Sequence, residues 1–144
     1  MHNIKLKKFY FINKINLKNL NKLNKNVSVI YRKYTGNIDE REIINIKRIC
    51  RKHNREFFIS NNFKLALKLS LDGVYLPSFN KSLRHKIYSL RKNFQIIGSA
   101  HNIKEIKEKE IQGANIIFLA SLFKKKKSLL GISKFNLLSK ETSK

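Results

Sequence analysis

The chain has 144 residues, and hydrophobic side chains make up 42% of it, a composition that excludes an intrinsically disordered protein. Lys and Arg total 32 against 9 for Asp and Glu, a net charge of +23. A charge this large favours an anionic partner such as nucleic acid, anionic lipid or a phosphorylated metabolite. No apolar run reaches the ~18 residues of a membrane span, and the single cysteine, Cys50, excludes an internal disulfide. We therefore expect a globular, cytoplasmic protein.

Six short apolar runs predict β-strands, because each is bounded by turn residues or by a helical pattern. In chain order the runs cover residues 9–12, 27–31, 57–59, 74–76, 94–97 and 116–119. Helical spacing of apolar residues predicts helices between them, over residues 15–23, 39–53, 65–69, 83–90 and 102–111, with a short final helix around residues 137–138. Asp39 and Asn102 are expected to cap the second and the fifth of these helices. The fourth helix depends on Leu83, Ile87 and Leu90.

The alternation of strands and helices predicts a parallel sheet covered by helices. No linker rich in Pro, Gly or Ser divides the chain, so we expect one domain over residues 1–144. A doubly wound open sheet would also fit this alternation, although no glycine-rich phosphate loop follows any of the expected strands. Alternation alone leaves both the barrel and the open sheet as alternatives.

Four motifs follow one another along the chain. They are VIYR at residues 29–32, FFISNNFKLALKLSLDGVYLPSFN at 57–80, IIGSAH at 96–101, and the strand and loop at 116–123 with Gly131 after them. In this order and spacing they resemble the thiamine-phosphate synthase / TenI family of (β/α)8 barrels. The resemblance implies an α/β fold, a partial (β/α)8 TIM-type barrel of about six parallel βα units. The last two units are expected to be missing, because a full barrel takes about 200 residues or more.

The residues that the resemblance assigns to substrate and phosphate binding lie at or just beyond the carboxyl ends of the expected strands, where a barrel builds its site. They are Arg32, Lys33, Asn61, Asn80, Ser99, Lys124, Lys125, Lys126, Lys127 and Ser128. Arg32 would grip pyrophosphate with its planar fork, and Ser99 would hold the product phosphate. Arg32 and His101 are the candidate catalytic residues. Each of these roles has a structural alternative: Arg32 as the exposed end of an edge strand, Ser99 as a helix cap, and His101 as a surface histidine in a turn.

The resemblance also implies Mg²⁺ held by two aspartates, one after the third strand and one after the fourth. Asn61 and Asn80 occupy those places here, and none of the nine acidic residues follows the carboxyl end of an expected strand. Mg²⁺ in proteins normally takes at least one or two carboxylates. We therefore expect no metal site and no cofactor in this chain.

Three functions stay open. The first is a synthase-like transferase of thiamine biosynthesis that couples a pyrimidine pyrophosphate to a thiazole phosphate, impaired by the missing carboxylates. The second is a TenI-like thiazole tautomerase, a branch that resembles this chain in lacking the aspartates and in its Leu-Pro-Ser at residues 76–78, with His101 as acid and base. The third is a non-enzymatic, basic partial barrel that binds RNA or other anions non-specifically.

The expected partner of the first two functions is a phosphorylated small molecule. Nucleic acid is expected only as a non-specific partner, because the lysines are spread along the whole chain as codon usage in an AT-rich genome would spread them. No membrane partner is expected. The strands at residues 9–12 and 116–119 would be the open edges of an incomplete barrel, and such edges could pair in a homo-oligomer.

Overall fold

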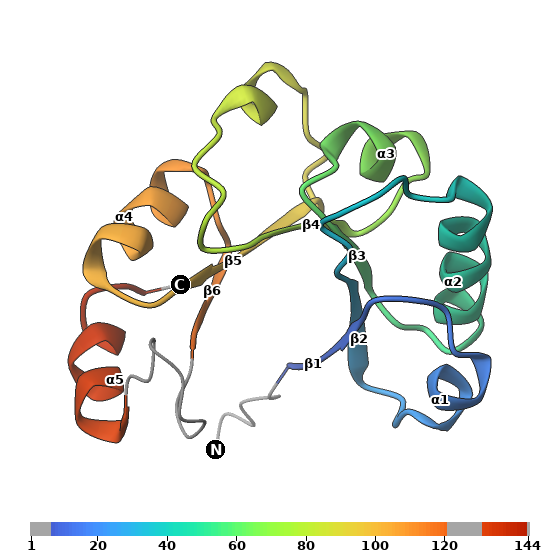
Figure 1. The fold of residues 1–144 in the computed structure, drawn as a ribbon, viewed down its shortest axis with the longest axis horizontal. Helices are drawn as coiled ribbons and strands as arrows, with labels where there is room; N and C mark the ends of the chain where they lie inside the picture. The colour runs from blue at the N-terminus through green and yellow to red at the C-terminus, as the bar shows by residue number, and fades with distance from the viewer. Residues whose placement is uncertain (1–6, 121–130, 144) are drawn as a thin grey trace. The chain divides into compact units, whose positions relative to one another are not determined.

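The computed structural model describes residues 7–120 and 131–143, and it contains all six expected strands (Figure 1). They are β1 (Lys8–Ile12), β2 (Val27–Tyr31), β3 (Phe57–Ser60), β4 (Gly73–Leu76), β5 (Gln95–Ala100) and β6 (Ile116–Leu119). Their order in the sheet is their order in the chain, β1-β2-β3-β4-β5-β6. The chain divides into two compact units, Met1–Gly73 and Val74–Lys144. The expected single domain stays a prediction. No helix in the described ranges is both long and apolar enough to cross a membrane.

In the first unit, three helices follow the strands: α1 (Leu17–Lys22), α2 (Glu40–Lys52) and α3 (Phe63–Lys68). β1 pairs with β2 and β2 pairs with β3, both in parallel, so that Ile12, Tyr31 and Ile59 lie in one row across the three strands. All three side chains are buried. Side chains alternate between the faces of a strand, and this row therefore belongs to a single buried face.

Helix α2 forms as expected from its capping and apolar residues. The side chain of Asp39 accepts a hydrogen bond from the Arg41 main-chain N–H at 2.9 Å, which satisfies one of the free donors of the first turn. Ile43, Ile46 and Cys50 are fully buried. Acidic residues lie in the first turn and basic residues in the last, the arrangement that the helix dipole favours.

In the second unit, a 3₁₀ turn η1 (Arg84–Ile87) and helices α4 (Ile103–Ile111) and α5 (Gly131–Ser139) accompany the strands. Asn102 caps α4 as expected, since its side chain accepts from the Glu105 main-chain N–H at 2.9 Å. β5 continues three residues beyond the expected end at residue 97. The reason is that Gly98, Ser99 and Ala100 all have register partners in β6, with which β5 pairs in parallel.

The expected helix over residues 83–90 is wrong. The segment forms only the four-residue turn η1, and Leu83 and Ile87 are 45% and 82% exposed instead of covering the sheet. The buried side chain of this turn is His85, whose Nε2 lies 2.8 Å from the main-chain oxygen of Gln112. A polar contact to the end of α4 therefore holds the segment where an apolar stripe was expected.

Candidate functional site

In the first unit, Arg32 and Lys33 extend past the carboxyl end of β2. The main-chain N–H of Arg32 donates to the Ile12 carbonyl at 2.7 Å, and its guanidinium lies over the Phe11 ring, 5.0 Å from the ring centroid. The hydroxyl of Ser60, the last residue of β3, donates to the Lys33 carbonyl at 3.4 Å. Because β2 has neighbours on both sides, Arg32 does not end an edge strand, but it is exposed, as that alternative expected.

Asn61 lies in the turn from β3 into α3, as the sequence predicts. Its φ of 61° is in the left-handed region, which Asn tolerates better than most residues. The next residue, Asn62, caps α3 by accepting from the Leu65 main-chain N–H at 2.9 Å. The ammonium of Lys33 donates to the Asn37 carbonyl at 2.8 Å. Arg32, Lys33 and Asn61 thus lie on adjoining loops of one unit.

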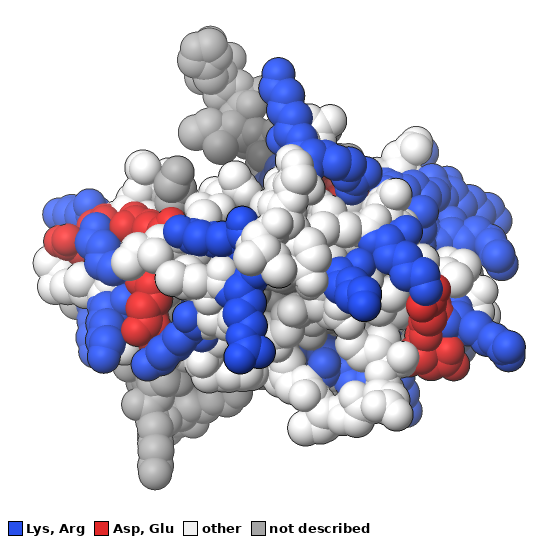
Figure 2. Space-filling view, turned by 90° about the horizontal axis from the view of Figure 1, so that it is seen from above, with Lys and Arg blue, Asp and Glu red and all other residues white. Residues whose placement is uncertain are grey.

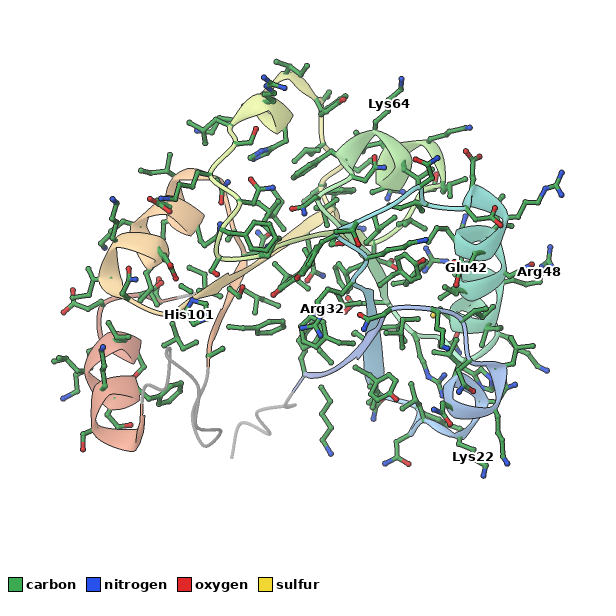
Figure 3. The ribbon with its side chains drawn as sticks, in the orientation of Figure 1. Lys22, Arg32, Glu42, Arg48, Lys64 and His101 are labelled. Atoms are coloured by element: carbon green, nitrogen blue, oxygen red, sulfur yellow. The ribbon has the colours of Figure 1, made fainter. Side chains whose placement is uncertain are left out.

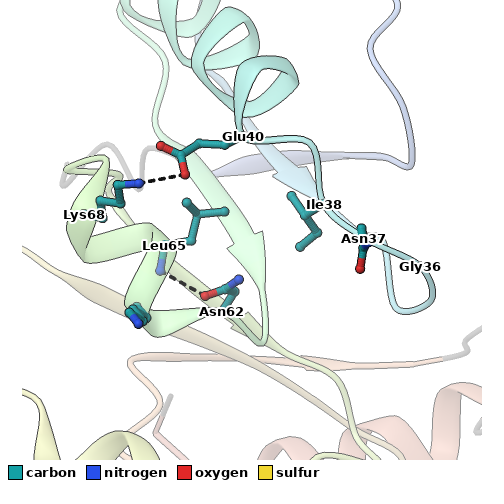
Figure 4. Close-up of a pocket in the computed structure, with 8 residues that line it drawn as sticks. Gly36, Asn37, Ile38, Glu40, Asn62, Leu65 and Lys68 are labelled. Carbon is teal, nitrogen blue, oxygen red and sulfur yellow. Dashed lines mark hydrogen bonds and ion pairs between the residues drawn. The ribbon is translucent and has the colours of Figure 1, made fainter.

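A cavity of about 620 Å³ opens between the loop at residues 36–38 and helix α3 (Figure 4). Asn62, Lys64 and Lys68 line it from α3 and its cap. The charge of Lys68 is paired, since its ammonium lies 2.8 Å from the carboxylate of Glu40. The cavity therefore combines this ion pair and Lys64 with amide and apolar walls, and no expected site residue lines it.

The carboxylate of Glu42 contacts both the end of β2 and the loop after β1. Its Oε2 accepts from the Tyr31 hydroxyl at 2.9 Å and its Oε1 from the Ile15 main-chain N–H at 2.7 Å. In Figure 3 Glu42 turns from α2 toward the strands, whereas Arg48 on the same helix points away from them. Burial first, and then the neighbouring carboxylate, raises the pKa of Tyr31. Glu42 is thus a structural acid that joins β2 to the loop after β1.

In the second unit, Ser99 lies within β5 and is buried. Its Oγ accepts a hydrogen bond from the Tyr75 hydroxyl at 3.0 Å. Tyr75, in β4, is a candidate site residue that the sequence reasoning missed. Because Asn102 is the residue that caps α4, the alternative of Ser99 as a helix cap is wrong.

His101 follows β5 directly and contacts a carboxylate. Oε2 of Glu105 accepts from the His101 main-chain N–H at 2.7 Å and lies 3.0 Å from the ring Nδ1. His101 is partly buried, so the alternative of an ordinary surface histidine does not describe it fully. The sequence places neither Glu105 nor Glu42 at the end of a strand, yet the fold brings Glu105 to His101 after β5 and Glu42 to Tyr31 at the end of β2. Both are the third residue after a capping Asp or Asn, the capping-box spacing, and this spacing was the available signal.

Asn80 lies in the turn after β4. Its main-chain N–H donates to the Pro77 carbonyl at 3.0 Å, and its side-chain oxygen accepts from the Ser82 main-chain N–H at 2.9 Å. Its own carbonyl accepts from the ammonium of Lys109 at 2.5 Å. Lys109 lies on α4 and is completely buried. The sequence reasoning placed no weight on this lysine.

The remaining expected phosphate ligands lie outside the described residues and stay predictions. They are Lys124, Lys125, Lys126, Lys127 and Ser128. Figure 2 shows Lys and Arg side chains distributed across the visible face, with acidic side chains among them in small groups. On that face the positive charge is therefore spread widely and does not form one basic patch.

Comparison with known proteins gives a consistent result. The chain matches the family described as thiamine monophosphate synthase over residues 19–143. It is 32% identical over 106 residues to a thiamine-phosphate synthase of Prochlorococcus marinus subsp. pastoris, covering 70% of this chain and 30% of that protein. It is 31% identical over 68 residues to the thiamine-phosphate synthase of Listeria monocytogenes, covering 47% of this chain and 32% of that protein.

Among solved structures, thiamine phosphate pyrophosphorylase from Pyrococcus furiosus superposes with a TM-score of 0.72 at 20% identity, covering 94% of this chain and 71% of that one. At this identity the likeness shows the fold, and it confirms the expected α/β barrel-type arrangement of βα units. The chain spans about a third of the length of the curated relatives it matches, 30% and 32% for the two named above.

Proposed function

Because the chain belongs to the thiamine monophosphate synthase family, we propose that it acts in thiamine biosynthesis by binding phosphorylated precursors at the carboxyl ends of its strands. The observation that carries this proposal is the setting of Arg32, whose main chain is bonded to Ile12 and whose guanidinium lies over Phe11. A guanidinium held in this way can donate two parallel hydrogen bonds to phosphate oxygens. The ligand that we assign to Arg32 is a pyrimidine pyrophosphate.

The second ligand that we assign is a thiazole phosphate, at Ser99. The Ser99 oxygen accepts from Tyr75, which leaves the serine's own O–H proton for an acceptor such as a phosphate oxygen. Both hydroxyls are buried, and a hydrogen bond to a charged phosphate is stronger in such surroundings than in water. Tyr75 would therefore orient Ser99 as a donor.

The donors present do not fit the Mg²⁺ that the resemblance implies. Asn61 and Asn80 offer amide oxygens where carboxylates are needed, and the side-chain oxygen of Asn80 already accepts from Ser82. Within the described ranges, no three His, Cys, Asp or Glu side chains come together as a metal-binding group. Mg²⁺ normally takes at least one or two carboxylates. We therefore expect the coupling of the two precursors to be slow or absent in this chain.

A second candidate function, the isomerisation of a thiazole phosphate, is favoured by the contact between His101 and Glu105. The carboxylate lies 3.0 Å from Nδ1, so a neutral ring would keep its proton on Nδ1 and present Nε2 as a base. Such a ring can take a proton from one carbon of a substrate and return it to another. This reaction needs no metal, and it uses only residues of the second unit.

Two assays on the 144-residue chain separate these functions. In the first, both thiamine precursors are incubated with the protein and Mg²⁺, with and without a chelator. We expect precursor binding without efficient coupling, and fast coupling that a chelator abolishes would overturn our account of the metal site. In the second assay, isomerisation of the thiazole phosphate is followed by NMR in deuterated water. If a carbon-bound proton exchanges with the unsubstituted chain but not with His101→Asn, the tautomerase is supported. Equal exchange with both proteins excludes it.

A further inference from the structure

A cluster of polar groups, some of them buried, joins α4 to the segment after β4. The ammonium of Lys109 donates to the Asn80 carbonyl at 2.5 Å and to the side-chain oxygen of Gln112 at 2.8 Å. The side-chain nitrogen of Gln112 donates to the Ser82 carbonyl at 2.9 Å and to the Asn80 carbonyl at 3.1 Å. We call Lys109, Gln112, Asn80, Ser82 and His85 the α4 clasp, since His85 contacts the main-chain oxygen of Gln112.

Three of the five residues of the α4 clasp are buried although they are polar. The exposed fractions of Lys109, Gln112 and His85 are 0%, 2% and 6%. Lysine is almost never fully buried unless its charge is matched by acceptors. Two oxygen acceptors from two different segments meet that requirement here. The cost of burying the ammonium is thus balanced only while Asn80 and Gln112 stay in place.

In this part of the unit the hydrogen bonds of the clasp hold the segment after β4, because its apolar side chains do not pack. The segment from β4 to β5 contains η1 instead of a full helix, and its apolar side chains Leu83 and Ile87 are largely exposed. It is joined to α4 by hydrogen bonds to Lys109 and Gln112 and by a looser pair between Lys81 and Glu108 at 3.7 Å. Directional hydrogen bonds therefore fix the position of this segment against α4.

We propose that Lys109 and Gln112 are positioning residues that hold Asn80 and the turn after β4 in the geometry needed to bind phosphate in the second unit. The role of the turn after β4 toward a ligand rests on the proposed function, which places the precursors at the carboxyl ends of the strands, whereas the role of Lys109 toward Asn80 rests on the contacts above. Helix α4 thereby controls a ligand-binding turn through two side chains. The charged groups that act on the Lys109 ammonium are Glu105 and Glu108 of α4 and Lys81.

The test uses the full chain with Lys109→Met, which keeps the length of the apolar stem and removes the ammonium. Hydrogen exchange of the main-chain amides at residues 80–86 is followed by NMR. We expect exchange to accelerate by about tenfold or more relative to the amides of β5, because a hydrogen bond to a charged donor is lost. Lys107→Met is the matched control, since Lys107 lies on the same helix with its side chain 54% exposed. Unchanged exchange at residues 80–86 in a folded Lys109→Met would overturn the proposal.

If Lys109→Met does not fold, Gln112→Met replaces it in the exchange experiment. We expect the same local acceleration of exchange in Gln112→Met, and its absence would overturn the proposal. Binding of inorganic phosphate, followed by ³¹P NMR, should weaken about tenfold in the clasp variants, while pyrophosphate binding assigned to Arg32 stays as in the unsubstituted chain. Local acceleration with unchanged phosphate affinity would overturn the positioning role. If the unsubstituted chain binds no phosphate at all, the proposed function fails, and the exchange experiment still decides the role of Lys109.

Discussion

The methylene chain of Lys109 fills the space that a side chain at Gly98 would need. A Cβ built on Gly98 would lie 2.8 Å from Cδ and 2.9 Å from Cγ of Lys109, closer than real Cβ contacts. β5 therefore has no side chain at the one point where the stem of the buried lysine crosses it. Glycine at 98 and lysine at 109 form a complementary pair, and changing either one should affect the other.

Gly98→Ala should destabilise the protein by about 1–3 kcal/mol, the usual cost of overpacking a well-packed core. Urea unfolding followed by circular dichroism measures the loss. In the double variant Gly98→Ala, Lys109→Ala the clash disappears, so the effect of Gly98→Ala should become much smaller in that background. Equal effects in both backgrounds would show that the two residues are not coupled.

The stability of the protein should depend on pH through Lys109. Burial lowers the pKa of its ammonium below the ordinary 10.5. As pH rises through the lowered pKa, the folded state releases this proton while the unfolded state still keeps it, so the folded state gains stability until pH passes 10.5. The free energy of unfolding, minus that of Lys109→Met, should therefore increase with pH in this window. A difference that decreases or stays flat would contradict the burial of a charged amine.

Cys50 should be chemically silent in the folded protein. It is fully buried, and burial raises the pKa of its thiol to about 11, so little of the reactive thiolate exists near neutral pH. A chromogenic disulfide reagent should react with the native chain only at the rate at which it unfolds. The chain in denaturant is the control and should react quickly. Rapid stoichiometric reaction of the native protein would show that α2 does not seal this thiol.

Glu105→Ala should loosen the start of α4. The change removes the acceptor for the His101 main-chain N–H and for its ring, and losing such an end-of-helix contact costs about 0.5–2 kcal/mol. Thermal unfolding measures the loss. Lys104→Ala, one residue earlier and exposed, is the matched control and should change stability little. If the two variants unfold at the same temperature, Glu105 contributes no more than an ordinary surface residue.

The sequence predicts the strands well because their signal is local. All six apolar runs form strands, and Asp39 and Asn102 cap their helices as expected, since these features depend on neighbouring residues alone. The predicted helix at residues 83–90 is wrong because this prediction also used only a local pattern. Leu83 and Ile87 have helical spacing, but in the folded chain they are exposed, and no local pattern tells an apolar residue that packs from one that does not.

The candidate site is predictable only in part. Sequence motifs predict Ser99 and Asn80 as site residues, yet their partners Tyr75 and Lys109 lie on other elements. A lysine in an amphipathic helix is read as solvent-facing by any rule based on hydrophobicity. Lys109 is buried instead because its stem packs against Gly98 and its ammonium meets two oxygen acceptors that only the fold brings together. Tertiary contacts of this kind are the part that sequence patterns leave out.

Pyrophosphate titration of three proteins by calorimetry tests the central claim most directly. The proteins are the unsubstituted chain, Arg32→Ala, and Arg48→Ala, which removes an equal charge from an exposed arginine that points away from the strands (Figure 3). We predict saturable binding that weakens in Arg32→Ala by about 1.5–3 kcal/mol, roughly 10- to 150-fold, and stays unchanged in Arg48→Ala. Equal affinities of the two variants would contradict the account, because binding would then reflect the overall positive charge and not a site at the end of β2.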